Sequence, residues 1–265
     1  MYFLDDICAV IVTYNPDVSV LQKNINSILK QISHCLIVDN GSKEYKLENI
    51  DESSVKIISL KDNKGIAYAL NVGLKYCSDN KYKLLLSMDQ DTILCENSIV
   101  QLLNAVNKGA DSVGINWDKR CNSNKNVEFL ITSGNLVKVD ALNSVNGYDS
   151  RLFIDSVDFD ISLRLKDAGY KLMKVANALA FHKIGEPDQN VKFNIKYFTH
   201  TAERYYYISR NHYYIENKYK KTHKIFCLKK KFFFYLDVLK ILLLDKERNQ
   251  KIKMIKLGKI DSTKI

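Results

Sequence analysis

The chain has 265 residues, of which 46% are hydrophobic, and it contains only two prolines and ten glycines. This composition excludes a disordered, collagen-like or repetitive protein and allows one large domain, or one domain with an appendage. The formal net charge of +10 leaves open an anionic partner, which could be nucleic acid, an acidic membrane surface or a polyanionic substrate.

The cysteines and the apolar runs bear on the cellular compartment. Six cysteines are scattered without a CxxC pair, which indicates reduced core thiols rather than a disulfide framework or a zinc site. Asp5 and Asp6 stand where a signal peptide needs basic residues. No uninterrupted apolar run reaches the ~18 residues of a membrane span. We therefore expect a cytoplasmic protein whose contact with a membrane, if any, is peripheral.

Short β-branched apolar runs alternate with helical apolar spacing through the first ninety residues. The alternation indicates parallel βα units, and thus an α/β fold whose sheet is covered by helices on both faces. Strands are predicted at Ile7–Thr13, Cys35–Val38, Val55–Leu60 and Leu84–Met88, and helices between Val18 and Ile32 and at Ile66–Cys77.

Beyond residue 95 the pattern becomes mixed. It predicts strands at Ala110–Ile115 and Phe129–Thr132, and a helix at Asp158–Ala168 that ends at Gly169. From about Thr199 the chain is helical and aromatic, and then basic. We place a boundary near residue 190, between an α/β domain of residues 1–190 and a helical, basic extension of residues 191–265.

Three polar clusters directly follow predicted strands: Thr13-Tyr14-Asn15, Asp39-Asn40-Gly41 and Asp89-Gln90-Asp91. In parallel sheets, ligands bind outside the carboxyl ends of the strands. We therefore expect the three clusters to converge on one crevice.

Carboxylates stand out in two places. Asp89 and Asp91 are two residues apart, so a strand-end turn can present both to one hard cation, Mg²⁺ or Mn²⁺. The alternative is a polar turn that merely caps a strand. Asp155, Asp158 and Asp160 surround the start of the predicted helix, where acids cap the helix or one of them accepts a proton from a substrate hydroxyl.

In their order and spacing these motifs resemble family 2 glycosyltransferases with the GT-A fold, especially the bacterial rhamnosyltransferase-like branch. That resemblance implies a Rossmann-like, mixed but mainly parallel sheet flanked by helices, with a helical basic C-terminal extension. It covers most of the chain. The matching segments are Ala9–Pro16, Ile37–Ser42, Asn63–Gly73, Met88–Thr92, Thr132–Gly134, Gly147–Asp149, Leu152–Arg164, His182–Glu186 and Arg204–Asn211.

The resemblance also implies roles for individual residues. Asp158 is the catalytic base, although Val157 stands where many relatives carry Glu. Asp39 accepts a hydrogen bond from the pyrimidine base. The implied ligands of Mn²⁺ or Mg²⁺ are Asp89, Asp91 and His182. The alternative for His182 is a hydrogen-bonded loop histidine. The implied donor-binding residues are Thr13, Tyr14, Asn15, Asp39, Asn63, Lys64, Asp89, Arg204 and Arg210.

The expected activity is an inverting transfer of rhamnose from dTDP-rhamnose to a lipid-linked saccharide during synthesis of surface polysaccharide or O-antigen. A UDP-hexose donor, such as UDP-galactose or UDP-glucose, is the first alternative, and a catalytically silent nucleotide-sugar-binding protein is another. A nucleotidyltransferase would need a glycine-rich phosphate loop that Thr13-Tyr14-Asn15-Pro16 does not supply. Nucleic acid is not an expected partner, because the basic stretch has no recognisable binding motif.

The C-terminal part combines lysines with an apolar run. Residues Tyr219 to Lys231 are strongly basic, and the aromatic and aliphatic stretch from Phe232 follows them. Such a segment could lie in a bilayer interface, with rings below and lysines at the headgroups. The alternative is that the apolar residues pack on the protein while the lysines face water.

Overall fold

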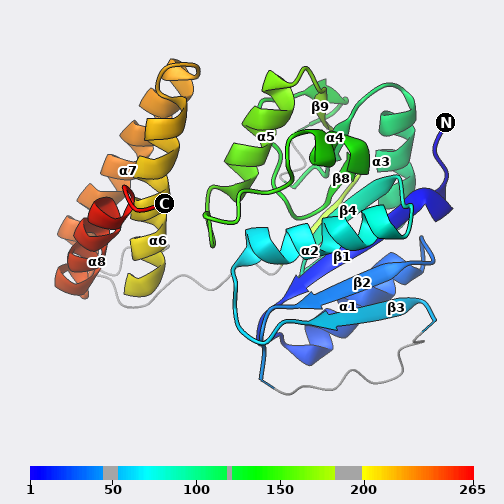
Figure 1. Cartoon of the computed structure of the whole chain (residues 1–265), viewed down its shortest axis with the longest axis horizontal. Helices are drawn as coiled ribbons and strands as arrows, with labels where there is room; N and C mark the ends of the chain where they lie inside the picture. The colour runs from blue at the N-terminus through cyan, green and yellow to red at the C-terminus, as the bar shows by residue number, and fades with distance from the viewer. Residues whose placement is uncertain (44–52, 118–120, 183–198) are drawn as a thin grey trace. The chain divides into compact units, whose positions relative to one another are not determined.

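The computed structural model describes residues 1–43, 53–117, 121–182 and 199–265 (Figure 1). The chain divides into two compact units. The first comprises Met1–Phe153 and Val157–Lys183, and the second comprises Ile154–Ser156 and Ile184–Ile265. Residue 190, where the sequence predicts a boundary, lies outside the described residues.

The first unit is built on an eight-stranded sheet in the order β3-β2-β1-β4-β8-β6-β9-β7. The four strands from β3 to β4 are parallel, whereas β8 runs antiparallel to both of its neighbours. This mixed sheet, flanked by helices, confirms the predicted fold class. Its strands are β1 (Ile7–Thr13), β2 (Cys35–Asp39), β3 (Val55–Ser59), β4 (Leu84–Asp89), β6 (Ser112–Gly114), β7 (Lys125–Asn126), β8 (Asn135–Lys138) and β9 (Leu172–Lys174).

Helices cover both faces of this sheet. Alternate residues of β1 bury against α1 and α3 on one face, and α2 packs on the other. A Cβ added at Gly73 of α2 would lie 2.4 Å from Cγ1 of Val10, so this close approach requires glycine. The helices of the unit are α1 (Val18–Leu29), α2 (Ile66–Asp79), α3 (Ser98–Asn107), α4 (Val139–Ser144) and α5 (Val157–Asp167), with a short 3-10 turn, η1, at Leu4–Asp6.

One predicted strand is wrong. Phe129–Thr132 has no strand structure, and the ladder begins only at Asn135 in β8. The reason is a turn at Gly134, whose φ is +73°. The Gly134 N–H donates to the Ser87 carbonyl, and the Ser87 hydroxyl donates to the Thr132 carbonyl. Residues 132–134 therefore bond to β4 as a turn and not as a strand.

Two short strands form a separate antiparallel sheet beside the main one. They are β5 (Thr92–Leu94) and β10 (Ala180–His182), and Thr92 stands opposite His182 in their register. The sequence analysis predicted neither strand, because three residues are too few to show the apolar alternation of a β-strand. The pairing matters for the site because β5 follows directly on Asp89-Gln90-Asp91.

The second unit contains the helices α6 (Ala202–Tyr219), α7 (Lys224–Leu244) and α8 (Arg248–Asp261), as the sequence predicts for this region. Gly258 lets α8 contact α6 closely, because a Cβ there would lie 2.3 Å from the Tyr206 carbonyl oxygen. Tyr205 is buried in the core of these helices together with Phe234, Ile241 and Ile255.

Polar groups are also buried in this unit. Lys251 and Asp245 form an ion pair of 2.7 Å with side chains 2% and 1% exposed. Burial, followed by the charges of Lys230 and Lys231, lowers the pKa of His212 to about 3, so its ring is neutral. In the described parts of the chain, no helix is both long enough and apolar enough to cross a membrane.

Candidate functional site

The ends of β1 and β2 meet at a buried pair of polar side chains. Thr13 and Asp39 are register partners in the parallel ladder, and the Thr13 hydroxyl donates to Asp39 Oδ1 at 3.0 Å. The N–H of Asn40 donates to the Thr13 carbonyl at 2.8 Å. The first two of the predicted polar clusters therefore converge, as the parallel arrangement requires.

The Asp39 carboxylate is oriented by neutral donors. It is only 6% exposed. Besides Thr13, the Ser42 hydroxyl donates to Oδ1 and the Ser42 N–H donates to Oδ2 at 3.1 Å. A carboxylate offers about four lone-pair sites, so these described donors leave room for a further one from a ligand.

Asn40, to which the sequence analysis assigned no role of its own, connects β2 to the loop before α2. Its side-chain N–H donates to Asn63 Oδ1 at 2.9 Å, and its Oδ1 accepts from the Lys64 N–H at 2.8 Å. Asn63 in turn accepts from the Gly65 N–H at 3.0 Å. The predicted donor residues Asn63 and Lys64 are thereby held at the same edge of the sheet as Asp39.

Gln90 joins the third cluster to the first. Its carboxamide oxygen accepts from the Tyr14 N–H at 2.8 Å, and its Nε2 donates to the Tyr14 carbonyl at 3.5 Å. Asn15, with φ at +45°, donates its N–H to the Ser42 hydroxyl at 2.7 Å. The Tyr14 side chain remains 47% exposed. All three clusters therefore belong to one hydrogen-bonded site, and the ring of Tyr14 is accessible to a ligand.

The backbone at the end of β4 is fixed from two sides. The Asp89 N–H donates to the Ser133 hydroxyl at 3.0 Å, and the Asp89 carbonyl accepts from Asn24 Nδ2 at 2.6 Å. Thr92 and Ser133 hydrogen-bond through their hydroxyls at 3.0 Å. The sequence analysis assigned no role to Asn24, and it included Ser133 only within the matching segment Thr132–Gly134, because both roles depend on contacts between distant segments. Asp89 and Asp91 themselves are each partly exposed on this rigid turn.

The donor set at this turn fits a hard cation. Among the residues that the structure describes, no group of three or more His, Cys, Asp or Glu side chains could hold a metal. However, Mg²⁺ is typically held by one or two carboxylates together with water and substrate phosphates, a need that Asp89 and Asp91 can meet. The backbone of His182 pairs with Thr92, next to Asp91, while its side chain lies outside the described part of the chain.

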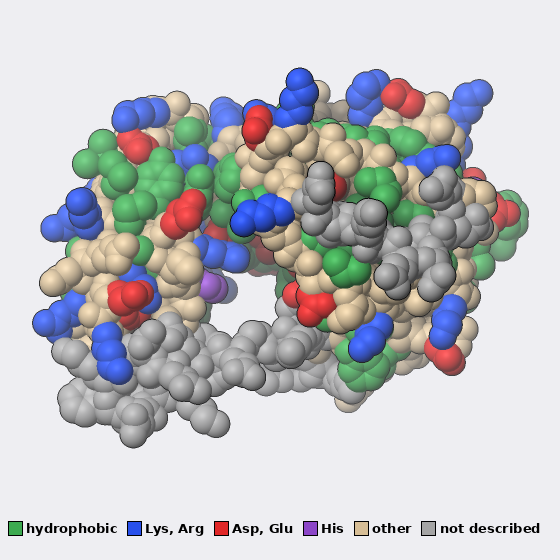
Figure 2. All heavy atoms as spheres, turned by 90° about the horizontal axis from the view of Figure 1, so that it is seen from below, with side chains coloured by type: hydrophobic (Ala, Val, Ile, Leu, Met, Phe, Trp, Pro, Cys, Tyr) green, Lys and Arg blue, Asp and Glu red, His purple; other side chains and the backbone are tan. Residues whose placement is uncertain are grey.

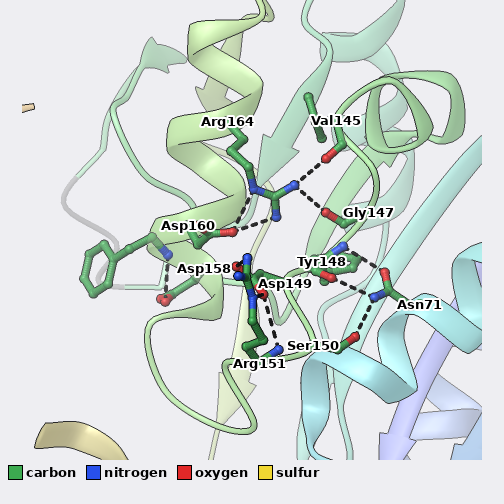
Figure 3. A network of polar contacts seen from close by, with 11 residues as sticks. Asn71, Val145, Gly147, Tyr148, Asp149, Ser150, Arg151, Asp158, Asp160 and Arg164 are labelled. Carbon is green, nitrogen blue, oxygen red and sulfur yellow. Dashed lines mark hydrogen bonds and ion pairs between the residues drawn. The ribbon is translucent and has the colours of Figure 1, made fainter. Parts of the chain in front are cut away.

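Asp158 and Asp160 occupy the first turn of α5 but differ in environment (Figure 3). Asp158 is partly exposed, and its Oδ1 accepts from the Phe159 N–H at 2.9 Å. Asp160 is fully buried and pairs with Arg164 at 2.7 Å. A substrate hydroxyl could therefore reach Asp158, whereas Asp160 is occupied inside the protein.

Arg164 connects α5 to the preceding loop. Besides its ion pair with Asp160, its Nη1 donates to the carbonyl oxygens of Val145 at 2.5 Å and Gly147 at 2.6 Å. The Asp160 side chain is 0% exposed and that of Arg164 is 19% exposed. This pair fixes α5 to residues 145–147.

Removing Arg164 should strongly destabilise the fold, because it leaves the Asp160 carboxylate buried without its countercharge. We expect Arg164→Ala to lower the free energy of unfolding by about 3–5 kcal/mol. Chemical denaturation measures this. Lys75→Ala is the control, because its pair with Asp79 is exposed and should contribute less than about 1 kcal/mol. Equal losses in the two variants would contradict a structural role for the Asp160–Arg164 pair.

The segment that leads to α5 is held along α2. Asn71 accepts from the Tyr148 N–H at 2.8 Å and donates to the Tyr148 carbonyl at 2.7 Å (Figure 3). The Ile66 N–H donates to the Phe153 carbonyl at 2.8 Å. Burial raises the pKa of Tyr148 well above its usual range, so this phenol stays neutral. Residues 148–153 are thus fixed just before the acidic turn.

Arg204 and Arg210 belong to the second unit and have protein partners there. Arg204 donates to both carboxylate oxygens of Asp155, at 2.9 and 3.2 Å. Arg210 is buried, donates to Asn211 Oδ1 at 3.0 Å, and lies 5.0 Å from the ring centroid of Tyr207. Contact of either arginine with phosphate stays a prediction.

Comparison with known sequences gives two matches that agree. The family model described as glycosyl transferase family 2 matches residues 8–153. The dTDP-rhamnosyl transferase RfbF of Shigella flexneri is 31% identical over 235 residues, which is 78% of this chain and 78% of that protein.

Solved structures share the fold at low sequence identity. GalNAc-T7 with UDP, GalNAc and Mn²⁺ has a TM-score of 0.59 at 15% identity, covering 66% of this chain and 43% of that one. TarS residues 1–349 of S. aureus, in complex with UDP-GlcNAc, has a TM-score of 0.54 at 14% identity, covering 97% of this chain and 72% of that one. The chain thus spans less than half of the first structure's length, and both matches bear on the fold alone.

Proposed function

The chain belongs to glycosyl transferase family 2, and on that premise we propose that it transfers rhamnose from dTDP-rhamnose to a saccharide acceptor with inversion. The observation that carries the proposal is the convergence of the three strand-end clusters on one site around Asp39. The choice of rhamnose is supported by the similarity to the Shigella flexneri dTDP-rhamnosyl transferase.

The nucleoside is proposed to bind at the ends of β1 and β2. A thymine or uracil ring presents an imide N–H, and the Asp39 carboxylate has capacity for one more donor beside Thr13 and Ser42. The exposed ring of Tyr14 is available to pack against the base. The backbone N–H groups nearby are mostly used within the protein, so side chains, including Asn63 and Lys64, are proposed to contact ribose and diphosphate.

Mn²⁺ or Mg²⁺ is proposed to be held by Asp89 and Asp91, with His182 as a third contact. When bound, such an ion offsets negative charge on the departing nucleoside diphosphate. The protein contributes a fixed turn, since Ser133 and Asn24 hold the backbone of Asp89 in place. The backbone of Asp89 is thus held by contacts within the protein.

Asp158 is proposed as the general base. Its carboxylate takes the proton of an acceptor hydroxyl while that oxygen forms a bond to the anomeric carbon. The bond from the anomeric carbon to the diphosphate oxygen breaks in the same displacement, and the configuration inverts. Asp158 is partly exposed and fixed on the first turn of α5, as this task requires.

A panel of nucleotide sugars tests the proposed activity. The purified chain is incubated with dTDP-rhamnose, UDP-glucose, UDP-galactose and UDP-GlcNAc in the presence of Mn²⁺ or Mg²⁺, and slow donor hydrolysis is followed without an acceptor. We expect release of dTDP from dTDP-rhamnose to be fastest. Faster release of UDP would replace the donor assignment by the UDP-hexose alternative, and binding without any release would favour a silent binding protein.

A lipid-linked acceptor is proposed on the basis of α7. Its residues Cys227, Phe234 and Ile241 are buried, whereas large apolar residues at helical spacing are exposed. Figure 2 shows hydrophobic side chains gathered on a face of this helical unit, with basic side chains beside them. The exposed large apolar residues of α7 are Ile225, Leu228, Phe232, Phe233, Tyr235, Leu236, Leu239, Leu242 and Leu243.

We expect the full chain to float with vesicles that contain phosphatidylglycerol, and less so at high salt, because each lysine near an anionic surface contributes about 1 kcal/mol. The double variant Phe232→Glu/Leu239→Glu should lose this binding, since its new charges would enter the bilayer interface. Ile131→Glu is the control, because Ile131 is 52% exposed but lies outside α7. A wild-type chain that ignores both anionic and neutral vesicles would leave the apolar face without a membrane role.

A further inference from the structure

The backbone of Tyr14 lies beyond the end of one of the ladders that flank β1. Pairing between β1 and β4 ends at Val12 and Asp89, after which β4 turns toward Asp91. Tyr14 is two residues past Val12, so its backbone has left the ladder on that side. A backbone amide that leaves a sheet needs another partner, either water or a side chain.

The Gln90 side chain supplies that partner. Its carboxamide has the same donor and acceptor groups as a peptide bond. Its Oε1 accepts from the Tyr14 N–H at 2.8 Å, and its Nε2 donates to the Tyr14 carbonyl at 3.5 Å, so the first bond is the stronger one. Among the hydrogen bonds that the structure describes, those to the backbone of Tyr14 come from Gln90 alone.

The next residue is held from the side of β2. Asn15 has a left-handed backbone, with φ at +45°, which a residue other than glycine keeps only where its surroundings hold it. Its N–H donates to the Ser42 hydroxyl at 2.7 Å, and its Oδ1 accepts from the Lys43 N–H at 3.0 Å. Loss of the Gln90 carboxamide would therefore release Tyr14 while these bonds to Asn15 remain.

Gln90 itself extends from a fixed backbone. The preceding residue, Asp89, is held through its N–H by Ser133 and through its carbonyl by Asn24. The Tyr14 ring, by contrast, is 47% exposed, so packing around the ring does little to fix its direction. The direction in which this ring leaves the chain depends on the backbone of Tyr14, which Gln90 holds.

We propose that Gln90 is a positioning residue for the nucleoside. Its carboxamide fixes the backbone of Tyr14 and thereby presents the tyrosine ring to the pyrimidine base. The inference rests on the proposed function, in which the base packs against Tyr14, and it gives the residue between two acids a role separate from the ion. Gln90 acts through Tyr14 and does not itself touch the base.

A double-mutant cycle tests whether Gln90 acts through Tyr14. The affinity for dTDP is measured by calorimetry in the presence of Mn²⁺. Gln90→Met keeps most of the side-chain volume but removes both hydrogen bonds, and it should weaken binding about 3- to 10-fold, the size of one net hydrogen bond. Tyr14→Ala should weaken binding at least as much. Gln90→Met/Tyr14→Ala should bind within about twofold of Tyr14→Ala, because without the ring Gln90 has nothing to position.

A second measurement separates this role from an effect on the ion, since Gln90 lies between the proposed ligands Asp89 and Asp91. The ratio of dTDP affinities with and without Mn²⁺ should keep its wild-type value in Gln90→Met. In kinetics with the active donor, the KM should rise by the same 3- to 10-fold factor, while kcat stays within about twofold. A fall in kcat, or a collapse of the Mn²⁺ ratio, would assign Gln90 to the metal turn instead.

Gln101→Met is the matched control, because Gln101 is also half-buried but lies in α3, outside the three clusters. It should bind dTDP like the wild type. If Gln90→Met does not fold, Gln90→Asn takes its place in the cycle, because its amide is one methylene too short to make the same bonds.

The outcomes separate this inference from the proposed function. Additive losses in the cycle, or wild-type affinity in Gln90→Met, would overturn the positioning role even in an active enzyme. A wild-type chain that binds dTDP but transfers no sugar would refute the proposed transfer, and the cycle would still decide on Gln90. A wild-type chain that binds neither dTDP nor UDP would refute both.

Discussion

Replacement of Asp158 by asparagine is expected to lower the transfer rate by about 10²–10⁴-fold, because an amide cannot accept the proton of the acceptor hydroxyl. The local structure should survive, since the amide oxygen can still accept from the Phe159 N–H, as Oδ1 does now. Donor affinity should also be retained, because the proposed donor site is built around Asp39 at the end of β2, whereas Asp158 lies on α5. Transfer kinetics and donor titration measure the two quantities separately.

The control for Asp158→Asn is Asp140→Asn. Asp140 is an exposed acid in the first turn of α4, so the same change is made in the same helical position without affecting the site. It should transfer at the wild-type rate. Transfer by Asp158→Asn at the rate of this control would remove Asp158 from the role of base. Asp160 could not replace it, because that carboxylate is fully buried against Arg164.

The regular part of the fold could be predicted from the sequence because its signals are local. A fully buried parallel strand such as β1 needs an unbroken apolar run, and Ile7–Thr13 supplies one. The ends of β1, β2 and β4 are each marked by polar residues, so the position of the candidate site followed from the rule that ligands bind there. The short strands β5 and β10 carry no such period and were missed.

The residues that complete the site could not be predicted, because their roles depend on contacts between distant segments. Gln90 reads as a spacer between two acids, yet its carboxamide bonds to the backbone of Tyr14. Ser133 lies in a segment that was predicted partly as strand, and the turn at Gly134 instead brings its hydroxyl to Asp89.

The other large expected effect concerns Asp91. We expect Asp91→Ala to abolish the Mn²⁺-dependent part of nucleoside diphosphate binding. The affinity should fall at least about 10–100-fold, because removing a residue that only supports a metal ligand already costs that much. The fold should be unaffected, because the turn is fixed through the backbone of Asp89 by Ser133 and Asn24.

Calorimetric titration of dTDP, with and without Mn²⁺, measures this effect. The wild type should bind more tightly with the ion, and Asp91→Ala should bind equally weakly in both conditions. Glu96→Ala is the matched control, because it removes an exposed carboxylate five residues further along the chain and should keep the dependence on Mn²⁺. If Asp91→Ala keeps the wild-type dependence, Asp91 is not a ligand. If the wild type itself binds dTDP equally well without the ion, the transfer must rely on basic side chains alone to offset the charge of the leaving diphosphate.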